Sequence, residues 1–138
     1  MDSQHNIRVV AAVIEKDGHY LITQRRPAAA LPLMWEFPGG RVEPGETEAD
    51  ALEREVRHRL DVEIETGELI SFVSHPYDSY VVDLYLYECR IVEGEPRARA
   101  VHGFKWVKSS EFDAVQFTPA DESSVAQLLG LELPDDEG

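Results

Sequence analysis

The segment from Gly40 to Val62, GRVEPGETEADALEREVRHRLDV, constrains the fold of this 138-residue chain more than any other part. Thr47, followed three residues later by Asp50, is typical of a helix N-terminus, where a hydroxyl group accepts a hydrogen bond from a backbone N–H. Apolar residues then recur at helical spacing, at Ala49, Leu52, Val56 and Leu60. The segment therefore predicts a glycine-rich loop and then an amphipathic helix over residues 48–60.

One face of this predicted helix is polar and points away from the apolar stripe. Residues three and four apart lie on the same side of a helix, so Glu55, His58 and Arg59 project together. The loop at residues 39–40 consists of two glycines, and we expect it to be flexible enough to bring backbone carbonyls and Glu46 beside that face. A loop and a helix face therefore converge on one candidate site.

The rest of the chain alternates strand and turn signals and ends with a second helix. Apolar and β-branched runs predict strands over residues 7–14, 20–24, 35–37, 62–74, 80–90 and 104–107. A loop with two prolines covers residues 26–34. Thr118, followed by Pro119 and Asp121, predicts the start of a helix that runs to Leu129. The strand over residues 80–90 is apolar on both faces, so we expect it to be central in its sheet.

Length and composition indicate one globular domain. The chain contains 43% hydrophobic and 29% charged residues and has no apolar run of membrane-spanning length. We expect residues 1–133 to form a single domain and the acidic residues 134–138 to be a disordered tail. A single cysteine and an N-terminus that lacks the features of a secretion signal predict a reducing, cytoplasmic setting.

The charge of the chain restricts its partners. Its formal net charge is −14, from 27 acidic residues against 13 lysines and arginines, and this field repels nucleic-acid backbones and anionic membranes. We therefore expect neither a nucleic-acid polymer nor a membrane as partner. A small phosphorylated ligand can still bind where a few cations gather, or where a divalent metal ion bridges acids to phosphate. The oligomeric state is not indicated by the sequence.

The predicted loop and helix resemble the Nudix box, G-x5-E-x7-R-E-U-x-E-E-x-G-U with U apolar, through Gly40, Glu46, Arg54 and Glu55. The segment Trp35–Gly40 is similar to the usual approach to that box in MutT-type nucleoside triphosphate pyrophosphohydrolases. The resemblance implies the Nudix fold, an α+β fold in which helices flank a mixed β-sheet as an α/β/α sandwich. It also implies that nucleoside triphosphates, modified or oxidised ones included, are hydrolysed to a monophosphate and pyrophosphate.

The resemblance further implies a divalent metal site. In that family the glutamates of the box bind magnesium, which neutralises the pyrophosphate and activates the attacking water. By this correspondence Glu55 is a metal ligand or base, Gly40 offers a backbone carbonyl to the metal, and Arg54 pairs with Glu46 to fix the loop. Three acids of the family are replaced in this chain, by His58, Arg59 and Ala100. We therefore expect weak binding of Mg²⁺, with Mn²⁺ as an alternative, and weak activity.

The resemblance also assigns residues to the substrate. Arg25 corresponds to an arginine on the phosphate side, and Glu36 and Phe37 lie near the base in a MutT-type pocket. Asp121 stands where MutT-type proteins often carry an asparagine that reads the base, and its alternative role is to cap the C-terminal helix. An ionised aspartate only accepts hydrogen bonds, which suits the exocyclic amine of cytosine or adenine. Arg59 is either a bidentate phosphate contact or a solvated helix cation.

Two alternatives concern the assignment as an enzyme. Glu55 can form an ion pair with Arg59 four residues later, a contact that stabilises an exposed helix by a few tenths of a kcal/mol, as an order of magnitude. The protein as a whole can be a non-catalytic nucleotide-binding or protein-interaction module that retained the pocket and lost the metal ion. The four matched residues of the box favour the enzyme, and the three replaced acids favour the module.

Overall fold

Strand β1 (Asn6–Lys16) organises the sheet, because three other strands pair with it. In the computed structural model, which describes residues 6–129, β1 runs parallel to β6 (Val81–Glu93). It runs antiparallel to β2 (His19–Gln24) and to β4 (Gly39–Arg41). Its apolar run VVAAVI suits a strand that is covered on both faces. The sheet is therefore built outward from the first strand of the chain.

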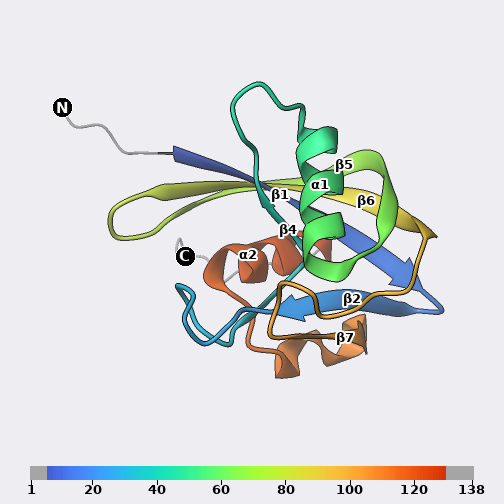
Figure 1. Ribbon diagram of the computed structural model, residues 1–138. Helices are drawn as coiled ribbons and strands as arrows, with labels where there is room; N and C mark the ends of the chain where they lie inside the picture. Colours follow the sequence, from blue (N-terminus) through green and yellow to red (C-terminus); the bar gives the residue numbers. More distant parts are fainter. Residues whose placement is uncertain (1–5, 130–138) are drawn as a thin grey trace.

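The remaining strands extend the sheet on both sides. β3 (Trp35–Glu36) and β7 (Gly103–Lys108) pair with β2, and β5 (Glu63–Pro76) pairs with β6. The strand order is β3-β2-β1-β6-β5, with β4 attached to β1 and β7 to β2. A parallel β1–β6 pair among antiparallel pairs makes the sheet mixed. The β5–β6 hairpin, green to yellow in Figure 1, reaches beyond the two helices at its closed end.

Two helices cover opposite faces of this sheet, and the side chains of β1 alternate between them. Every second residue of β1 from Val10 to Ile14 packs in one core cluster with α1 (Glu48–Leu60). The residues between them pack in a second core cluster with α2 (Pro119–Leu128). Figure 1 shows the two helices, green and red, with the strands passing between them. This arrangement confirms the α+β fold and the α/β/α sandwich.

Helix α1 begins as its sequence predicts but buries a different set of residues. The Thr47 hydroxyl accepts a hydrogen bond from the backbone N–H of Asp50 at 3.0 Å, which caps the first turn. Ala51 is fully buried, whereas Ala49 is only partly buried, so the expected place of Ala49 in the core is wrong. The helix packs on β4 as well as on β1, and this rotates the buried face toward Ala51 and Glu55.

Two further expectations about the chain are wrong. The two glycines at residues 39–40 belong to strand β4 and are not a flexible loop, because Val10 and Ala11 of β1 pair with them. The short 3-10 helix η1 (Ser109–Ala114) after β7 was not expected, and its Phe112 packs in the core cluster of α2. In both places a tertiary contact decides the local structure. The other expected strands and both helices are present with small shifts of their ends.

Some expectations lie outside the part of the chain that the structure describes. The acidic residues 134–138 are among them, so the predicted tail stays a prediction, and so does a single domain over residues 1–133. Over residues 6–129, none of the helices combines the length and the apolar character needed to cross a membrane.

The close approach of β4 to β1 generates a prediction about Gly39. A Cβ atom at this position would lie 1.9 Å from the carbonyl oxygen of Val10 and 2.7 Å from the Cα atom of Ala11. Because the backbone of β1 is held by its other partners, Gly39→Ala should lower the free energy of unfolding by at least about 2 kcal/mol, measured by urea denaturation. Gly103→Ala is the control, since its nearest neighbour would be Gln24 Oε1 at 3.7 Å. Equal stability of the two variants would contradict the packing argument.

Candidate functional site

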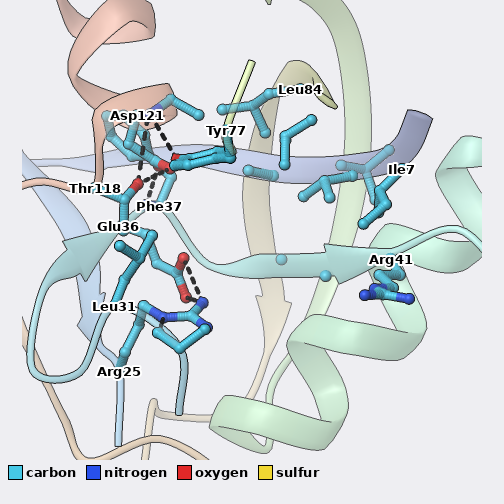
Figure 2. Close-up of a pocket in the computed structure, with 18 of the residues that line it drawn as sticks. Ile7, Arg25, Leu31, Glu36, Phe37, Arg41, Tyr77, Leu84, Thr118 and Asp121 are labelled. Carbon is cyan, nitrogen blue, oxygen red and sulfur yellow. Dashed lines mark hydrogen bonds and ion pairs between the residues drawn. The ribbon is translucent and has the colours of Figure 1, made fainter. Parts of the chain in front are cut away.

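A cavity of about 610 Å³ brings the predicted substrate-binding residues together. It lies on β1, β4 and β6, and it extends from the start of α2 to the last turn of α1 (Figure 2). Six of the residues singled out from the sequence line it: Arg25, Glu36, Phe37, Gly40, Arg59 and Asp121. Glu46, Arg54 and Glu55 do not line the cavity and lie behind its Gly40 wall. The predicted residues therefore form two adjacent groups.

Asp121 closes the α2 end of the cavity and connects this helix to the segment before β4. Its Oδ2 accepts a hydrogen bond from the backbone N–H of Phe37 at 2.9 Å, and its Oδ1 accepts one from the Thr118 hydroxyl at 2.8 Å. Only 5% of the residue is exposed. Burial, together with the nearby Glu36 carboxylate, raises the pKa of Asp121 to about 7.

These contacts revise the expected role of Asp121. The Thr118 hydroxyl accepts a hydrogen bond from the backbone N–H of Asp121 at 3.3 Å, so Thr118 caps α2. The Asp121 carboxyl does not complete a capping box, because the backbone N–H of Thr118 donates to the carbonyl of Trp35 at 2.9 Å. The expectation of an ionised aspartate did not include this burial, which favours the protonated form of the carboxyl by raising its pKa. Phe37 is 2% exposed and stacks on Phe117 with ring centroids 5.8 Å apart, so most of its ring belongs to the core.

Arg25 and Glu36 form an ion pair in the middle of the cavity. Nη1 of Arg25 lies 3.1 Å and 3.3 Å from the two carboxylate oxygens of Glu36, as the dashed lines in Figure 2 show. Nε of the same guanidinium donates to the carbonyl of Ala30 at 2.6 Å. Burial raises the pKa of Glu36, while the positive charges of Arg25 and Arg59 act to lower it. Arg25 is therefore largely engaged by groups of the protein itself.

Two tyrosines and one arginine of the cavity were missed by the sequence analysis. Tyr77 and Tyr80 stack with their ring centroids 5.2 Å apart, and the Tyr77 hydroxyl accepts a hydrogen bond from the backbone N–H of Ala120 at 3.2 Å. Arg41 lines the cavity at the end next to α1 (Figure 2). The two tyrosines lie in the turn between β5 and β6, where a pair of aromatic residues is a signal that we could have used.

Glu46 and Arg54 fix the loop in front of α1. Nε and Nη2 of Arg54 donate to the two carboxylate oxygens of Glu46 at 2.7 Å and 2.8 Å, a bidentate contact. The backbone N–H of Glu43 donates to Glu46 Oε1 at 2.9 Å. These contacts, the arginine first, lower the pKa of Glu46 to about 2, and the pKa of Arg54 is raised. The expected pairing of Arg54 with Glu46 is therefore present in the structure.

Glu55 lies between two arginines. Its Oε2 accepts from Nη1 of Arg54 at 2.9 Å, and its Oε1 accepts from Nε of Arg59 at 3.0 Å. Only 12% of its side chain is exposed. A Cβ atom on Gly40 would lie 2.3 Å from Cδ of Glu55, so the absence of a side chain at Gly40 lets Glu55 lie against β4. The ion pair with Arg59, one of the two interpretations of Glu55, is thus observed.

The side chains in this region offer few free oxygen atoms to a magnesium ion. Over the described residues, no group of three or more His, Cys, Asp or Glu side chains is placed to hold a metal ion. Both oxygens of Glu55 and both oxygens of Glu46 already accept from arginines. Ala100, which stands where the family has an acid, lies at the end of α1, where its backbone N–H donates to the carbonyl of Arg59 at 3.1 Å.

The buried carboxyl of Asp121 predicts a pH dependence of stability. Its pKa is raised on folding, so the folded state holds a proton that the unfolded state releases, and stability from this group is lost as the pH rises through about 7. Asp121→Asn removes this titration, so the free energy of unfolding should fall less from about pH 5 to about pH 8 in the variant than in the wild type. Urea denaturation at both pH values measures the difference. The exposed Asp113→Asn is the control, and an unchanged fall in Asp121→Asn would refute the assignment.

Comparisons with known proteins agree with the fold. The NUDIX domain family matches residues 9–127 of this chain. The CTP pyrophosphohydrolase of Escherichia coli is 33% identical over 125 residues, which cover 91% of this chain and 93% of that protein. The 8-oxo-dGTP diphosphatase of Haemophilus influenzae is 32% identical over 124 residues, which cover 89% of this chain and 91% of that protein.

A solved structure supports the same assignment. The solution structure of the E. coli ORF135 protein superposes with a TM-score of 0.79 at 28% identity. The match covers 98% of this chain and 96% of that one. The mixed sheet between two helices, the Gly40–Glu55 arrangement and these relatives lead to one conclusion: the chain belongs to the NUDIX domain family.

Proposed function

We propose that this protein is a MutT-type nucleoside triphosphate pyrophosphohydrolase with impaired metal binding. The observation that carries the proposal is the cavity that joins an acidic and aromatic end at α2 to an arginine-rich end at α1. The names of its relatives support it, since CTP and 8-oxo-dGTP are both nucleoside triphosphates. The proposed ligand is therefore a small nucleotide.

The two ends of the cavity suit the two parts of a nucleotide. Tyr77 and Tyr80 offer ring surfaces against which a base can pack beside Asp121. Arg41 lies at the other end (Figure 2), and Arg59 lines the cavity from the last turn of α1. Both cations attract phosphate oxygens. Figure 2 shows Asp121 on the left and Arg41 on the right, at opposite sides of the view. We therefore place the base at the α2 end and the phosphates at the α1 end.

The carboxyl groups at the base end bear on base preference. Glu36 and Asp121 are close enough for the charge of Glu36 to raise the pKa of Asp121. A neutral carboxyl group donates one hydrogen bond, and an ionised one only accepts. Together the two groups can match a base edge that carries both donors and acceptors. The proposal therefore covers nucleotides of cytosine and of oxidised guanine.

The proposed reaction is hydrolysis of a phosphoanhydride bond. Water adds to the phosphorus atom, the P–O bond to the leaving group breaks, and the products are a nucleoside monophosphate and pyrophosphate. A divalent ion, which Glu55 and the backbone carbonyl of Gly40 would hold, would supply neutralisation of the phosphate charge and activation of the water. In this chain Glu55 is the proposed catalytic acid–base group, and Glu46 and Arg54 are positioning residues that hold the loop and Gly40 against it. Because Glu55 is held by two arginines, we expect slow turnover.

Pyrophosphate release from a panel of nucleotides, with Mg²⁺, Mn²⁺ or a chelator, tests the proposed function. We expect slow, metal-dependent turnover, with CTP and 8-oxo-dGTP among the substrates. Glu55→Gln should lower the turnover number by about 100-fold or more, because it removes the carboxylate that lies against Gly40. Glu53→Gln is the control on the same helix, where Glu53 accepts a hydrogen bond from Thr66. No turnover across the panel would favour the non-catalytic module.

The replaced acids lead to a second test, which refills the metal site. The free protein should bind Mg²⁺ with a dissociation constant of roughly millimolar or weaker, measured by calorimetry, because few oxygen ligands are left. Changing His58, Arg59 and Ala100 together to glutamate should tighten Mg²⁺ binding by about tenfold or more and raise turnover. The same three positions changed to glutamine are the control for packing. Unaltered Mg²⁺ affinity in the glutamate variant would show that these positions do not converge on one ion.

A further inference from the structure

We propose that Arg59 binds a phosphate group without a metal ion, in the cavity that Arg41 also lines, and that this phosphate replaces Glu55 as the partner of the Arg59 guanidinium. The inference rests on the proposed nucleotide site. It differs from that proposal in the group that neutralises the phosphate charge, which here is an arginine. The ligand is recognised by its phosphate oxygens.

The arginines of the cavity differ in how fully they are engaged. Arg25 is held by both oxygens of Glu36 and by the carbonyl of Ala30. For Arg59, the contact found within the described residues runs through Nε to Glu55, although a guanidinium has five N–H donors in a planar fork. Its side chain is 28% exposed and lines the cavity. Arg59 therefore has an edge that can take phosphate oxygens in a bidentate contact.

Glu55 can lose Arg59 without becoming an uncompensated charge. Its second oxygen accepts from Arg54 at 2.9 Å, and Arg54 is itself fixed by the bidentate contact to Glu46. Removing one partner of a buried ion pair is costly when the other charge is left alone. Here Arg54 stays as the partner of Glu55. The exchange of Arg59 from carboxylate to phosphate is therefore a change of partner between two anions.

The backbone around Arg59 is anchored, so the exchange requires only movement of its side chain. The carbonyl of Arg59 accepts from the backbone N–H groups of Arg99 at 3.0 Å and Ala100 at 3.1 Å. Side chains of a helix lean toward its N-terminus, which places the Arg59 guanidinium over the turn that carries Glu55. Arg41 is anchored as well, because its carbonyl accepts from Nη2 of Arg54 at 3.0 Å.

The charge at position 59 favours phosphate over a metal ion. Arginine keeps its positive charge at any ordinary pH, so it repels a divalent cation and attracts phosphate oxygens. The net charge of the chain is −14, so an anionic ligand depends on such local cations. The same replacement of a family acid by Arg59 also removes an oxygen ligand for magnesium. Both observations assign the charge neutralisation in this cavity to arginine.

Calorimetric titration with inorganic pyrophosphate in excess chelator tests the inference. The wild type should bind pyrophosphate, and Arg59→Gln should weaken binding by roughly 10- to 100-fold, the loss expected for hydrogen bonds to a charged group. Arg59→Lys keeps the charge and loses the fork, so its affinity should fall between the two. Arg57→Gln is the matched control, because it removes the same charge from the same turn, where Arg57 pairs with Glu63. Melting temperatures confirm that each variant is folded.

Glu55→Gln should change pyrophosphate affinity in the opposite direction to Arg59→Gln. It therefore separates the inference from a role of Glu55 as a metal ligand. Without the carboxylate, Arg59 loses its competing partner, so metal-free pyrophosphate binding should tighten by a few-fold. Weaker binding in Glu55→Gln, equal losses in Arg57→Gln and Arg59→Gln, or no metal-free binding by the wild type would each overturn the inference. Metal-dependent turnover without metal-free binding would leave the proposed function intact. Metal-free binding without turnover would support the phosphate site and reject the enzyme.

Discussion

The rest of the site depends on the hydrogen bonds of the Arg54 guanidinium. It bonds to both oxygens of Glu46, to one oxygen of Glu55 and to the backbone carbonyl of Arg41. One planar group thus joins the loop, the helix and the strand that surround the α1 end of the cavity. The acids draw such a group into the fold because charge-assisted, bidentate hydrogen bonds are the strongest of their kind. Arg41 and Arg59 take their places around this fixed centre.

The sequence predicted the parts of the fold that local patterns determine. The cap at Thr47, the helix after it and the paired strands follow from side-chain spacing and turn residues, which the chain carries plainly. Strand β4 could not be predicted in this way, because two glycines have no strand preference of their own and pair only because β1 lies beside them. The buried place of Ala51 has a similar origin, in the packing of α1 on β4.

Most residues of the candidate site could be predicted from the sequence, but their pKa values and hydrogen-bond partners could not. The resemblance to the Nudix box grouped Glu46, Arg54 and Glu55, and the structure does bring them into contact. The state of Asp121 could not be read from its neighbours in sequence, because its burial and the charge of Glu36 come from distant segments. Tyr77 was missed for the same reason, since a turn residue shows its role only when α2 lies against it. Contacts between distant segments set the chemistry of side chains that spacing only identifies.

The segment from Phe37 to Arg41 has a consequence for the size of the ligand. Its first backbone N–H is bound by Asp121 at the start of α2, and its last carbonyl is bound by Arg54 of α1. Four residue steps of extended chain span about 13 Å, and both ends of this span are anchored. The length of the segment therefore fixes the distance between the two helices, and with it how far apart a base and its phosphates must be to reach both. A ligand shorter than this span would reach only one of the two helices.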